Sequence, residues 1–199
     1  MNHNHFQIHN VISDGIVTSE KYFDKLVSLL NQISKSDDRL AANYSIESVQ
    51  LDKHLSFDLL ADPEDKIISF AGVFSGGRYP EGVYRVLNRT WVAPEHRVDH
   101  GKFKYLTSKF ILNQQLQVLE KRLKLVFVSR ERPTGGLFLE KWRRSRTDSD
   151  LWTVSEDLVQ VVPDVEKKSC YQFICSRQFG KSHWHPKRIS LDEWRKLPE

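Results

Sequence analysis

The sequence is poor in cysteine and methionine, and it has no apolar run long enough to cross a membrane. Two cysteines and one methionine occur among its 199 residues, and a membrane span needs about 18–20 consecutive apolar residues. The polar start of the chain lacks the basic and apolar regions of a secretory signal. We therefore expect a cytoplasmic protein. Cys170 and Cys175 lie at odd spacing in one expected strand, so they face opposite sides and should stay reduced.

A strong excess of charge and a cluster of metal ligands are also missing. The formal net charge is only +4, which suits an anionic cofactor but identifies no partner. No zinc-finger, RNP or helix-turn-helix pattern is present, so nucleic acid is not an expected partner. His3, His5 and His9 have no second ligand group, and His183–His185 is a lone H-x-H. No metal site is expected.

Alternating apolar residues predict three successive strands, at 54–60, 66–74 and 84–92. The connections, 61–65 and 75–82, are short and rich in Asp, Pro and Gly, which favour turns. Connections this short usually join antiparallel neighbours. We therefore expect an antiparallel meander.

A long helix and the second half of the sheet follow Pro94. The proline ends the preceding strand, and apolar residues at helical spacing continue from Phe103 to Leu123. The apolar run at 123–128 predicts a strand that is buried on both faces. A strand–helix–strand connection of this length implies that 84–92 and 123–128 are parallel neighbours. A second helix is expected at 137–146, and two closing strands at 152–162 and 170–175.

Together these elements predict an α/β fold with a mixed, mostly antiparallel central sheet of about six or seven strands, flanked by helices. A weak strand at 6–11 and a helix that begins at Thr18-Ser19-Glu20 precede the meander. The length suits one domain, 1–180. Residues 181–199 form a tail, in which Ser190–Glu193 is a capping box for a short helix.

The stretch around Pro94 carries a family resemblance. Trp91-Val92-Ala93-Pro94 ends a strand, Arg97 follows three residues later, and Gly101 precedes the long helix. This V-x-P-x-x-R pattern resembles the cofactor motif of the Gcn5-related N-acetyltransferases (GNAT), and the resemblance extends over roughly residues 5–178. In that family the amides of a glycine-rich turn bind the pyrophosphate of acetyl-CoA. Here Val98, Asp99 and His100 stand where the family has glycines, so the motif is degenerate.

The resemblance implies a sheet that is splayed at the signature strand 84–92. In the family this strand parts from its parallel neighbour, here near Ser129, and the cofactor occupies the gap, as ligands do at switch points of open sheets. The residues that would contact acetyl-CoA by this analogy are Trp91, Val92, Arg97, Val98, Asp99, His100, Gly101, Lys102, Ser129 and Thr134.

Acid–base residues are scarce near this motif. Acetylation of an amine needs a base for the ammonium proton and a proton for the leaving thiolate. The signature strand has no Asp, Glu or His, and Glu81 at its mouth is the nearest candidate base. The tyrosine that often serves the family as general acid corresponds to Leu139 in this chain. Tyr79, Tyr84 and Tyr105 are possible substitutes.

Three functions remain open from the sequence. The first is an acyl-CoA-dependent N-acyltransferase that transfers acetyl to a primary amine of a small molecule or peptide by direct attack. The second is a catalytically silent GNAT-like protein that binds a ligand or protein in the same cleft. The third is an aminoacyl-tRNA-dependent transferase, which would use a basic region after the buried strand. The same region could instead contact a cofactor phosphate or an acidic substrate, or be a solvated helix face, as charge runs usually are. This region contains Arg130, Arg132, Lys141, Arg143, Arg144 and Arg146.

Overall fold

The computed structural model of the protein describes residues 6–36, 44–75, 79–97, 102–131, 135–155 and 172–180. Within these, the side chains at 102–108, 130–131, 135–138, 155 and 172–174 are not described. The predicted tail helix lies outside the described residues. The chain divides into two compact units: a first unit, Met1–Ser75 and Val86–Val118, and a second unit, Gly76–Arg85 and Leu119–Glu199. Whether 1–180 is one domain stays a prediction.

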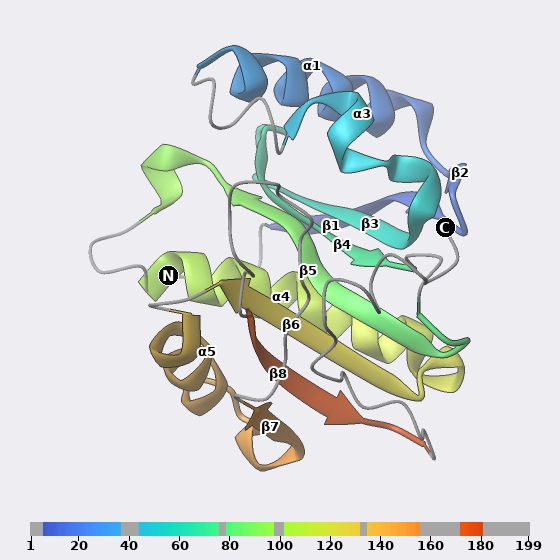
Figure 1. Ribbon diagram of the computed structural model, residues 1–199. Helices are drawn as coiled ribbons and strands as arrows, with labels where there is room; N and C mark the ends of the chain where they lie inside the picture. The colour runs from blue at the N-terminus through green and yellow to red at the C-terminus, as the bar shows by residue number, and fades with distance from the viewer. Residues whose placement is uncertain are drawn as a thin grey trace, which may run out of the picture. The chain divides into compact units, whose positions relative to one another are not determined.

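The described residues form one eight-stranded mixed sheet in the order β2-β1-β3-β4-β5-β6-β8-β7 (Figure 1). The predicted α/β class is confirmed, and the sheet gains the two-residue strand β2. The strands are β1 Gln7–Ser13, β2 Ile16–Val17, β3 His54–Ala61, β4 Ile67–Phe74, β5 Val83–Val92, β6 Leu125–Glu131, β7 Trp152–Ser155 and β8 Gln172–Gln178. The helices are α1 Glu20–Ser36, α3 Ile46–Val49, α4 Lys102–Leu119 and α5 Gly135–Arg144. Short 3₁₀ turns are η2 Leu51–Lys53, η3 Pro94–His96, η5 Glu120–Arg122 and η6 Ser149–Leu151.

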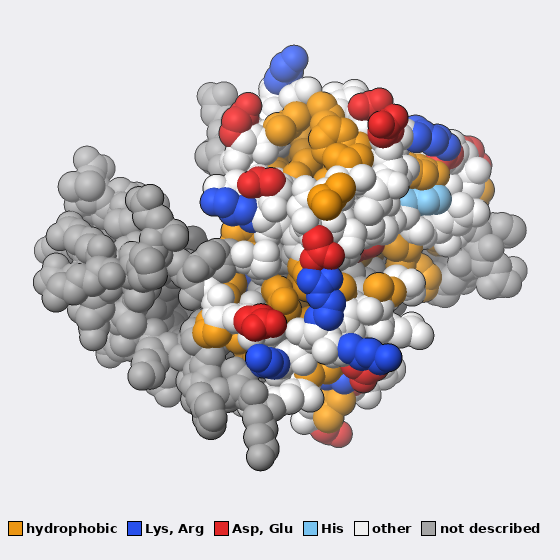
Figure 2. All heavy atoms as spheres, turned by 90° about the vertical axis from the view of Figure 1, so that its right-hand side faces the viewer, with side chains coloured by type: hydrophobic (Ala, Val, Ile, Leu, Met, Phe, Trp, Pro, Cys, Tyr) orange, Lys and Arg blue, Asp and Glu red, His pale blue; other side chains and the backbone are white. Residues whose placement is uncertain are grey.

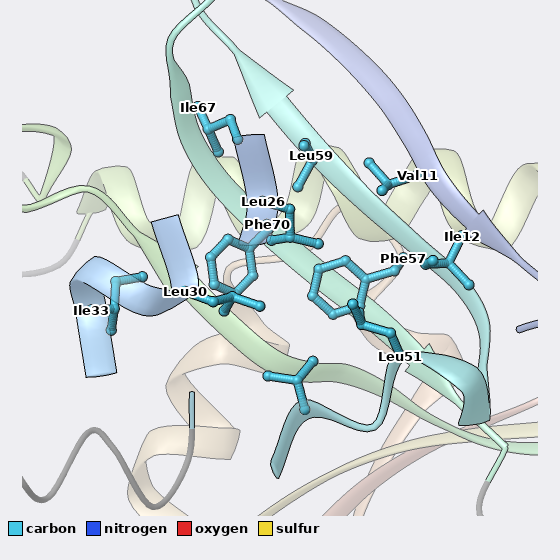
Figure 3. Close-up of a cluster of buried hydrophobic side chains, with 11 residues drawn as sticks. Val11, Ile12, Leu26, Leu30, Ile33, Leu51, Phe57, Leu59, Ile67 and Phe70 are labelled. Atoms are coloured by element: carbon cyan, nitrogen blue, oxygen red, sulfur yellow. The ribbon is translucent and has the colours of Figure 1, made fainter. Parts of the chain in front are cut away.

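The core of the first unit lies between α1 and the sheet. Helix α1 buries Leu26, Leu30 and Ile33 along one face, the spacing of an amphipathic helix. These residues pack with Phe57 of β3 and Phe70 of β4, whose ring centroids are 5.6 Å apart (Figure 3). Burial of such side chains contributes roughly 1.5–3 kcal/mol each. The apolar pattern of α1 is thus satisfied by the strands that follow it.

The opposite face of the same strands is covered by α4. Phe57 and Leu59 belong to the cluster under α1, so Asp58 between them points to the other face. There Nε2 of Gln115 in α4 donates to Asp58 Oδ2 (2.7 Å) and to the Ala71 carbonyl (2.9 Å). Helices α1 and α3 therefore lie on one side of β3 and β4, and α4 on the other (Figure 1). This double cover explains why every residue of β3 is buried.

Two predicted helix ends were wrong. The long helix was expected to reach Leu123, but α4 ends at Leu119 and the 3₁₀ turn η5 follows. The Leu123 amide donates to the Glu120 carbonyl, a tightening that is common at helix ends. The second helix ends at Arg144 instead of Arg146. Apolar spacing continues past the end of α4 to Leu123, which is itself buried.

The second unit contains the predicted parallel strand pair. Val83, Tyr84 and Arg85 of β5 pair in parallel with Leu125, Val126 and Phe127 of β6. Beyond this, β6 pairs antiparallel with β8 along its length, and β8 pairs with β7. Helix α5 contacts β6 and β8. The predicted parallel neighbours and closing hairpin are confirmed, although the described parts of the hairpin strands, β7 and β8, differ in extent from the prediction.

None of the described helices is long and apolar enough to cross a membrane. Over the face in Figure 2, Lys and Arg side chains are interspersed with Asp and Glu side chains of the described residues. Interspersed charges of both signs produce only a weak net field. The described surface on this side therefore gives no support to the nucleic-acid alternative.

A hairpin that the pattern analysis missed closes the edge of the first unit. Asp14 and Gly15 have φ of 52° and 75° and join β1 to β2. Positive φ at both central residues is the signature of a type I′ turn, for which Asp-Gly is a favoured pair. Their amides donate to the carbonyls of Leu55 and His54. The Asp14-Gly15 dipeptide could therefore have predicted the β1–β2 hairpin from the sequence.

We expect Gly15→Ala to lower the free energy of unfolding by roughly 1–3 kcal/mol, because alanine resists this φ and lacks room. A Cβ on Gly15 would lie 2.4 Å from the Asp52 carbonyl oxygen. Chemical denaturation would measure the change. Gly180→Ala is the matched control, since a Cβ there meets nothing within 4 Å. Equal stability of the two variants would contradict the strained turn.

Candidate functional site

Strand β5 is irregular just before the segment where the sequence placed the cofactor motif. Leu87 and Arg89 both have φ of 53°, an uncommon backbone region for residues other than glycine. Such residues cost about 1–3 kcal/mol each and persist only where the surroundings hold them. They gather at functional sites more often than elsewhere. Nothing in the pattern of the strand, which reads as regular, signals this irregularity.

Side chains within the first unit hold the irregular segment in place. The Thr90 hydroxyl donates to the Leu87 carbonyl (2.6 Å), which bridges the kink locally. The Tyr44 hydroxyl, just before α3, donates to the Thr90 carbonyl (2.9 Å). Nη2 of Arg89 donates to the Ser48 carbonyl in α3 (3.0 Å). The kink of β5 is therefore tied to the α3 segment as well as to its own strand.

The last two carbonyls of β5 are also hydrogen-bonded by side chains. The Ser69 hydroxyl of β4 donates to the Trp91 carbonyl (2.8 Å). Nε of Arg97, after η3, donates to the Val92 carbonyl (2.7 Å). The Trp91 ring stacks on Phe70 at 5.5 Å, so it belongs to the core. The cofactor contacts predicted for Trp91 and Val92 would therefore come from their backbone groups, although both carbonyls already accept one hydrogen bond.

Arg97 is exposed, and the hydrogen bond from its Nε to the Val92 carbonyl fixes its side chain. Helix α4 starts at Lys102, directly after the predicted turn. The first amides of a helix lack internal partners and attract anions. Val98, Asp99, His100, Gly101 and Thr134 lie outside the described residues, as does the side chain of Lys102. Their contacts stay predictions.

The remaining predicted site residues lie in the second unit. Ser129 is buried in β6 and pairs with Ile174 of β8. It stands two residues past Phe127, where the described β5–β6 pairs end. Glu81 is exposed in the turn before β5. Leu139, at the usual tyrosine position, is fully buried in α5.

The possible acids differ in accessibility. Tyr79 packs edge-on against Phe127, with centroids 5.2 Å apart. Tyr84 is buried in β5. The side chain of Tyr105 lies outside the described residues. None of these positions singles out a proton donor.

Solved structures identify the fold, although no protein-family model and no curated protein matches the chain. An acetyltransferase from Streptococcus agalactiae superposes with a TM-score of 0.52 at 8% identity, over 87% of this chain and 98% of that chain. The spermidine N-acetyltransferase from Vibrio cholerae, in complex with CoA and spermine, has a TM-score of 0.50 at 9% identity, over 88% and 96%. The chain has the GNAT fold. At this identity, the likeness concerns the fold alone.

His54 of β3 is a buried polar residue, hydrogen-bonded to β5, that the sequence did not point to. It is 1% exposed, and its Nδ1 lies 3.0 Å from the Gln50 carbonyl. A carbonyl only accepts, so Nδ1 carries the proton and Nε2 accepts from Nδ2 of Asn88, 3.1 Å away. Burial lowers the pKa of His54 to about 4. The imidazole is therefore neutral at physiological pH.

The basic region includes arginines that are held by carboxylates. Arg143 and Arg144 donate to Glu140 in α5, and these hydrogen bonds lower the pKa of Glu140 to about 2. Arg146 is buried, with its Nε 2.6 Å from Asp148 Oδ1. The described arginines of this region therefore favour the interpretation as a helix face with salt bridges over that as a binding surface. The side chains of Arg130 and Arg132 lie outside the described residues.

Arg146 is enclosed by aromatic rings. Its guanidinium carbon lies 5.1 Å from the Trp142 ring centroid and 4.9 Å from that of Trp152. Asp148 also accepts from Trp152 Nε1 (3.1 Å) and from Arg177 Nη1 (2.6 Å). A charge held this way is a structural element of the second unit, since desolvation makes it costly to unpair.

Neither metal ligation nor thiol chemistry is supported by the described residues. His9 stacks on Tyr22 at 3.8 Å, and no group of three His, Cys, Asp or Glu that could hold a metal occurs among the residues described. His3, His5, His183 and His185 lie outside them. Burial raises the pKa of Cys175 to about 12, so its thiol is unreactive. Cys170 is not described, and its expected reduced state stays a prediction.

We expect Asp148→Ala to cost about 3 kcal/mol of unfolding free energy, because it leaves the buried Arg146 without its carboxylate. Glu140→Ala is the control, since it breaks more exposed pairs to Arg143 and Arg144 and should cost clearly less. Thermal and urea unfolding would measure both. A smaller loss for Asp148→Ala than for Glu140→Ala would refute the structural role.

We expect the free energy of unfolding to decrease as the pH is lowered from 6.5 to about 4, because His54 stays neutral in the folded protein over this range. Between its ordinary pKa of 6.5 and about 4, the unfolded chain binds a proton that the folded chain excludes. The free energy of unfolding should therefore decrease as pH falls, by up to about 3 kcal/mol from this group. His54→Gln removes the titration. Urea unfolding at about pH 7.5 and about pH 4.5 should show a smaller loss in the variant, and equal losses would count against a neutral His54.

Proposed function

We propose that the protein is an acyl-CoA-dependent N-acyltransferase that transfers acetyl from acetyl-CoA to a primary amine. The observation that carries the proposal is the GNAT fold, with β5 leading through η3 to the first residue of α4. One structural neighbour was solved with CoA and spermine, which supports a CoA co-substrate. The acceptor would be a small molecule or peptide amine, and the location would be the cytoplasm.

The pyrophosphate of the cofactor would bind at residues 97–102. The helix start supplies amides and a positive dipole end. Arg97 uses Nε for the Val92 carbonyl, and a guanidinium has four further N–H donors on its two terminal nitrogens. The pantetheine arm would pair with the backbone of Trp91 and Val92. Because Val98 is β-branched and resists positive φ, we expect weaker binding than with a full glycine turn.

The chemical step would be direct attack. The neutral amine nitrogen adds to the thioester carbonyl, the C–S bond breaks, and the products are an amide and the CoA thiolate. Glu81 at the mouth of β5 would first take the ammonium proton directly or through water. The proton that the nitrogen loses as it becomes the amide would pass through water to the thiolate, which leaves as the CoA thiol. The orienting groups in this scheme are mainly backbone groups, which fits a strand without Asp, Glu or His side chains.

A silent GNAT-like binding protein is the second candidate. The observation in its favour is the fully buried Leu139 at the position of the usual tyrosine, since leucine transfers no proton. The two candidates differ in turnover. They share a binding site, so a binding measurement alone tests the site, and an assay for released CoA thiol with amine acceptors tests catalysis.

We expect acetyl-CoA to bind the wild type, with an affinity that falls as salt rises, because exposed charge contacts are screened. The test variant is Arg97→Gln combined with Lys102→Gln. Glutamine places Nε2 where arginine has Nε, so the bond to the Val92 carbonyl can persist while the charge is lost. The loss should be on the order of 1.5–3 kcal/mol per charged hydrogen bond.

The control is Lys35→Ala combined with Lys53→Ala, which removes the same charge from exposed positions of the first unit. Calorimetric titration at low and high salt would compare the three proteins. Equal affinity of wild type and Arg97→Gln/Lys102→Gln at both salt levels would refute the pyrophosphate site. No detectable binding to the wild type would refute the acyl-CoA proposal.

A further inference from the structure

One side chain of the first unit spans three strands. His54 belongs to β3 and Asn88 to β5, and β4 lies between them in the sheet. Strands two places apart are separated by about 9.5 Å, yet His54 Nε2 and Asn88 Nδ2 are 3.1 Å apart. The imidazole must therefore lie across β4.

Gly72 is what makes this crossing possible. A Cβ on Gly72 of β4 would lie 2.3 Å from Cδ2 and 2.6 Å from Nε2 of His54. Any other residue would displace the ring from its place over the strand. Phe57 and Phe74 contact the ring edge-on, with centroids 5.1 and 5.3 Å away. The His54 ring is thus confined by two aromatic side chains and lies directly over Gly72.

The hydrogen bond between His54 and Asn88 connects β3 to the irregular part of β5, residues 87–89. Asn88 is buried and stands between Leu87 and Arg89, the two residues with φ of 53°. Two strained residues on either side of one hydrogen-bonded amide indicate that the amide fixes the path of the strand. Four residues further along the strand, the path reaches Val92.

We propose that His54, Gly72 and Asn88 act together as a positioning device that sets the path of β5 and so aims the backbone of Trp91 and Val92. The link to the cofactor rests on the proposed function, in which those backbone groups pair with the pantetheine arm. His54 contacts neither cofactor nor acceptor in this scheme, so it is a positioning residue. The device requires one state of the ring, with the proton on Nδ1 for the Gln50 carbonyl and Nε2 free to accept from Asn88.

Two variants disturb the device in different ways. Gly72→Ala retains both hydrogen-bonding partners and displaces the rings of His54 and Phe57, since its Cβ would lie 2.3 Å from His54 Cδ2 and 2.8 Å from Phe57 Cδ2. Asn88→Asp keeps the shape of the side chain but turns the donor into an acceptor, so the bond can persist only if His54 gains a proton on Nε2. A purely structural loss of packing would change stability in both variants but would not protonate the ring in the second.

Nuclear magnetic resonance without cofactor gives the first readout. In the wild type, one histidine ring should stay neutral with its proton on Nδ1 while exposed histidines titrate. In Asn88→Asp the same ring should carry two N–H protons at neutral pH. The amide signals of residues 87–92 should shift in Gly72→Ala and stay in place in Gly180→Ala, its control in open space.

Acetyl-CoA affinity gives the second readout, measured well below the melting temperature of every variant. Gly72→Ala should bind about tenfold more weakly than wild type, the effect of about 1.4 kcal/mol. Leu26→Ala removes a core side chain of α1 and also loses stability. It should keep wild-type affinity, because it leaves the bridge to β5 intact.

The device would be overturned if Gly72→Ala left the β5 amide signals unmoved, or if it bound acetyl-CoA as well as Leu26→Ala does. A His54 ring that carries its proton on Nε2 in the wild type would also overturn it. Failure of the wild type to bind acetyl-CoA would end the proposed function and the link to the cofactor. The ring and amide signals would still decide whether the device exists.

Discussion

Burial of β3 on both faces is the constraint on which the first unit depends. The strand carries polar residues at positions that α1 and α4 cover, and buried polar groups must find partners inside the protein. Asp58 receives hydrogen bonds from Ser56, Asn10 and Gln115, and burial raises its pKa. These bonds connect β3 to β1 and α4. His54 makes the equivalent connection to β5.

This arrangement gives the polar residues of β3 a common role. Burial of each polar residue costs free energy, and a hydrogen bond to another strand or helix offsets that cost. A partly satisfied network of this kind would be less stable than an apolar core. The strands and helices of the first unit are therefore positioned by a few directional contacts in addition to apolar packing, and the kink of β5 is the local consequence.

The candidate chemistry follows from backbone geometry more than from reactive side chains. The described residues near β5 include a neutral buried histidine, half-buried aromatic rings and carbonyls that accept from side chains. One charged cluster of the second unit, Arg146, Asp148 and Arg177, is used in its own structure, with Arg146 between two tryptophans. A protein built this way can orient a ligand through amides and carbonyls, and leave proton transfer to a loop carboxylate or water.

The sequence by itself determined most of the elements and their order. Apolar periodicity located α1, β3, β4, β5 and β6, because each pattern depends on residues a few positions apart. The crossover length determined that β5 and β6 are parallel, and the V-x-P-x-x-R stretch pointed to the GNAT fold. The Asp-Gly turn could have been read in the same way.

Only the tertiary structure decided the features that join distant parts of the chain. His54 and Asn88 are 34 positions apart, and Gly72 matters only because a ring from another strand lies on it. The strained φ at Leu87 and Arg89 has no local signal, since leucine and arginine do not favour it. The end of α4 at Leu119 likewise does not follow from its apolar spacing, which continues to Leu123. Local patterns encode secondary structure, whereas the shape of the candidate site depends on contacts that exist only after the strands have paired.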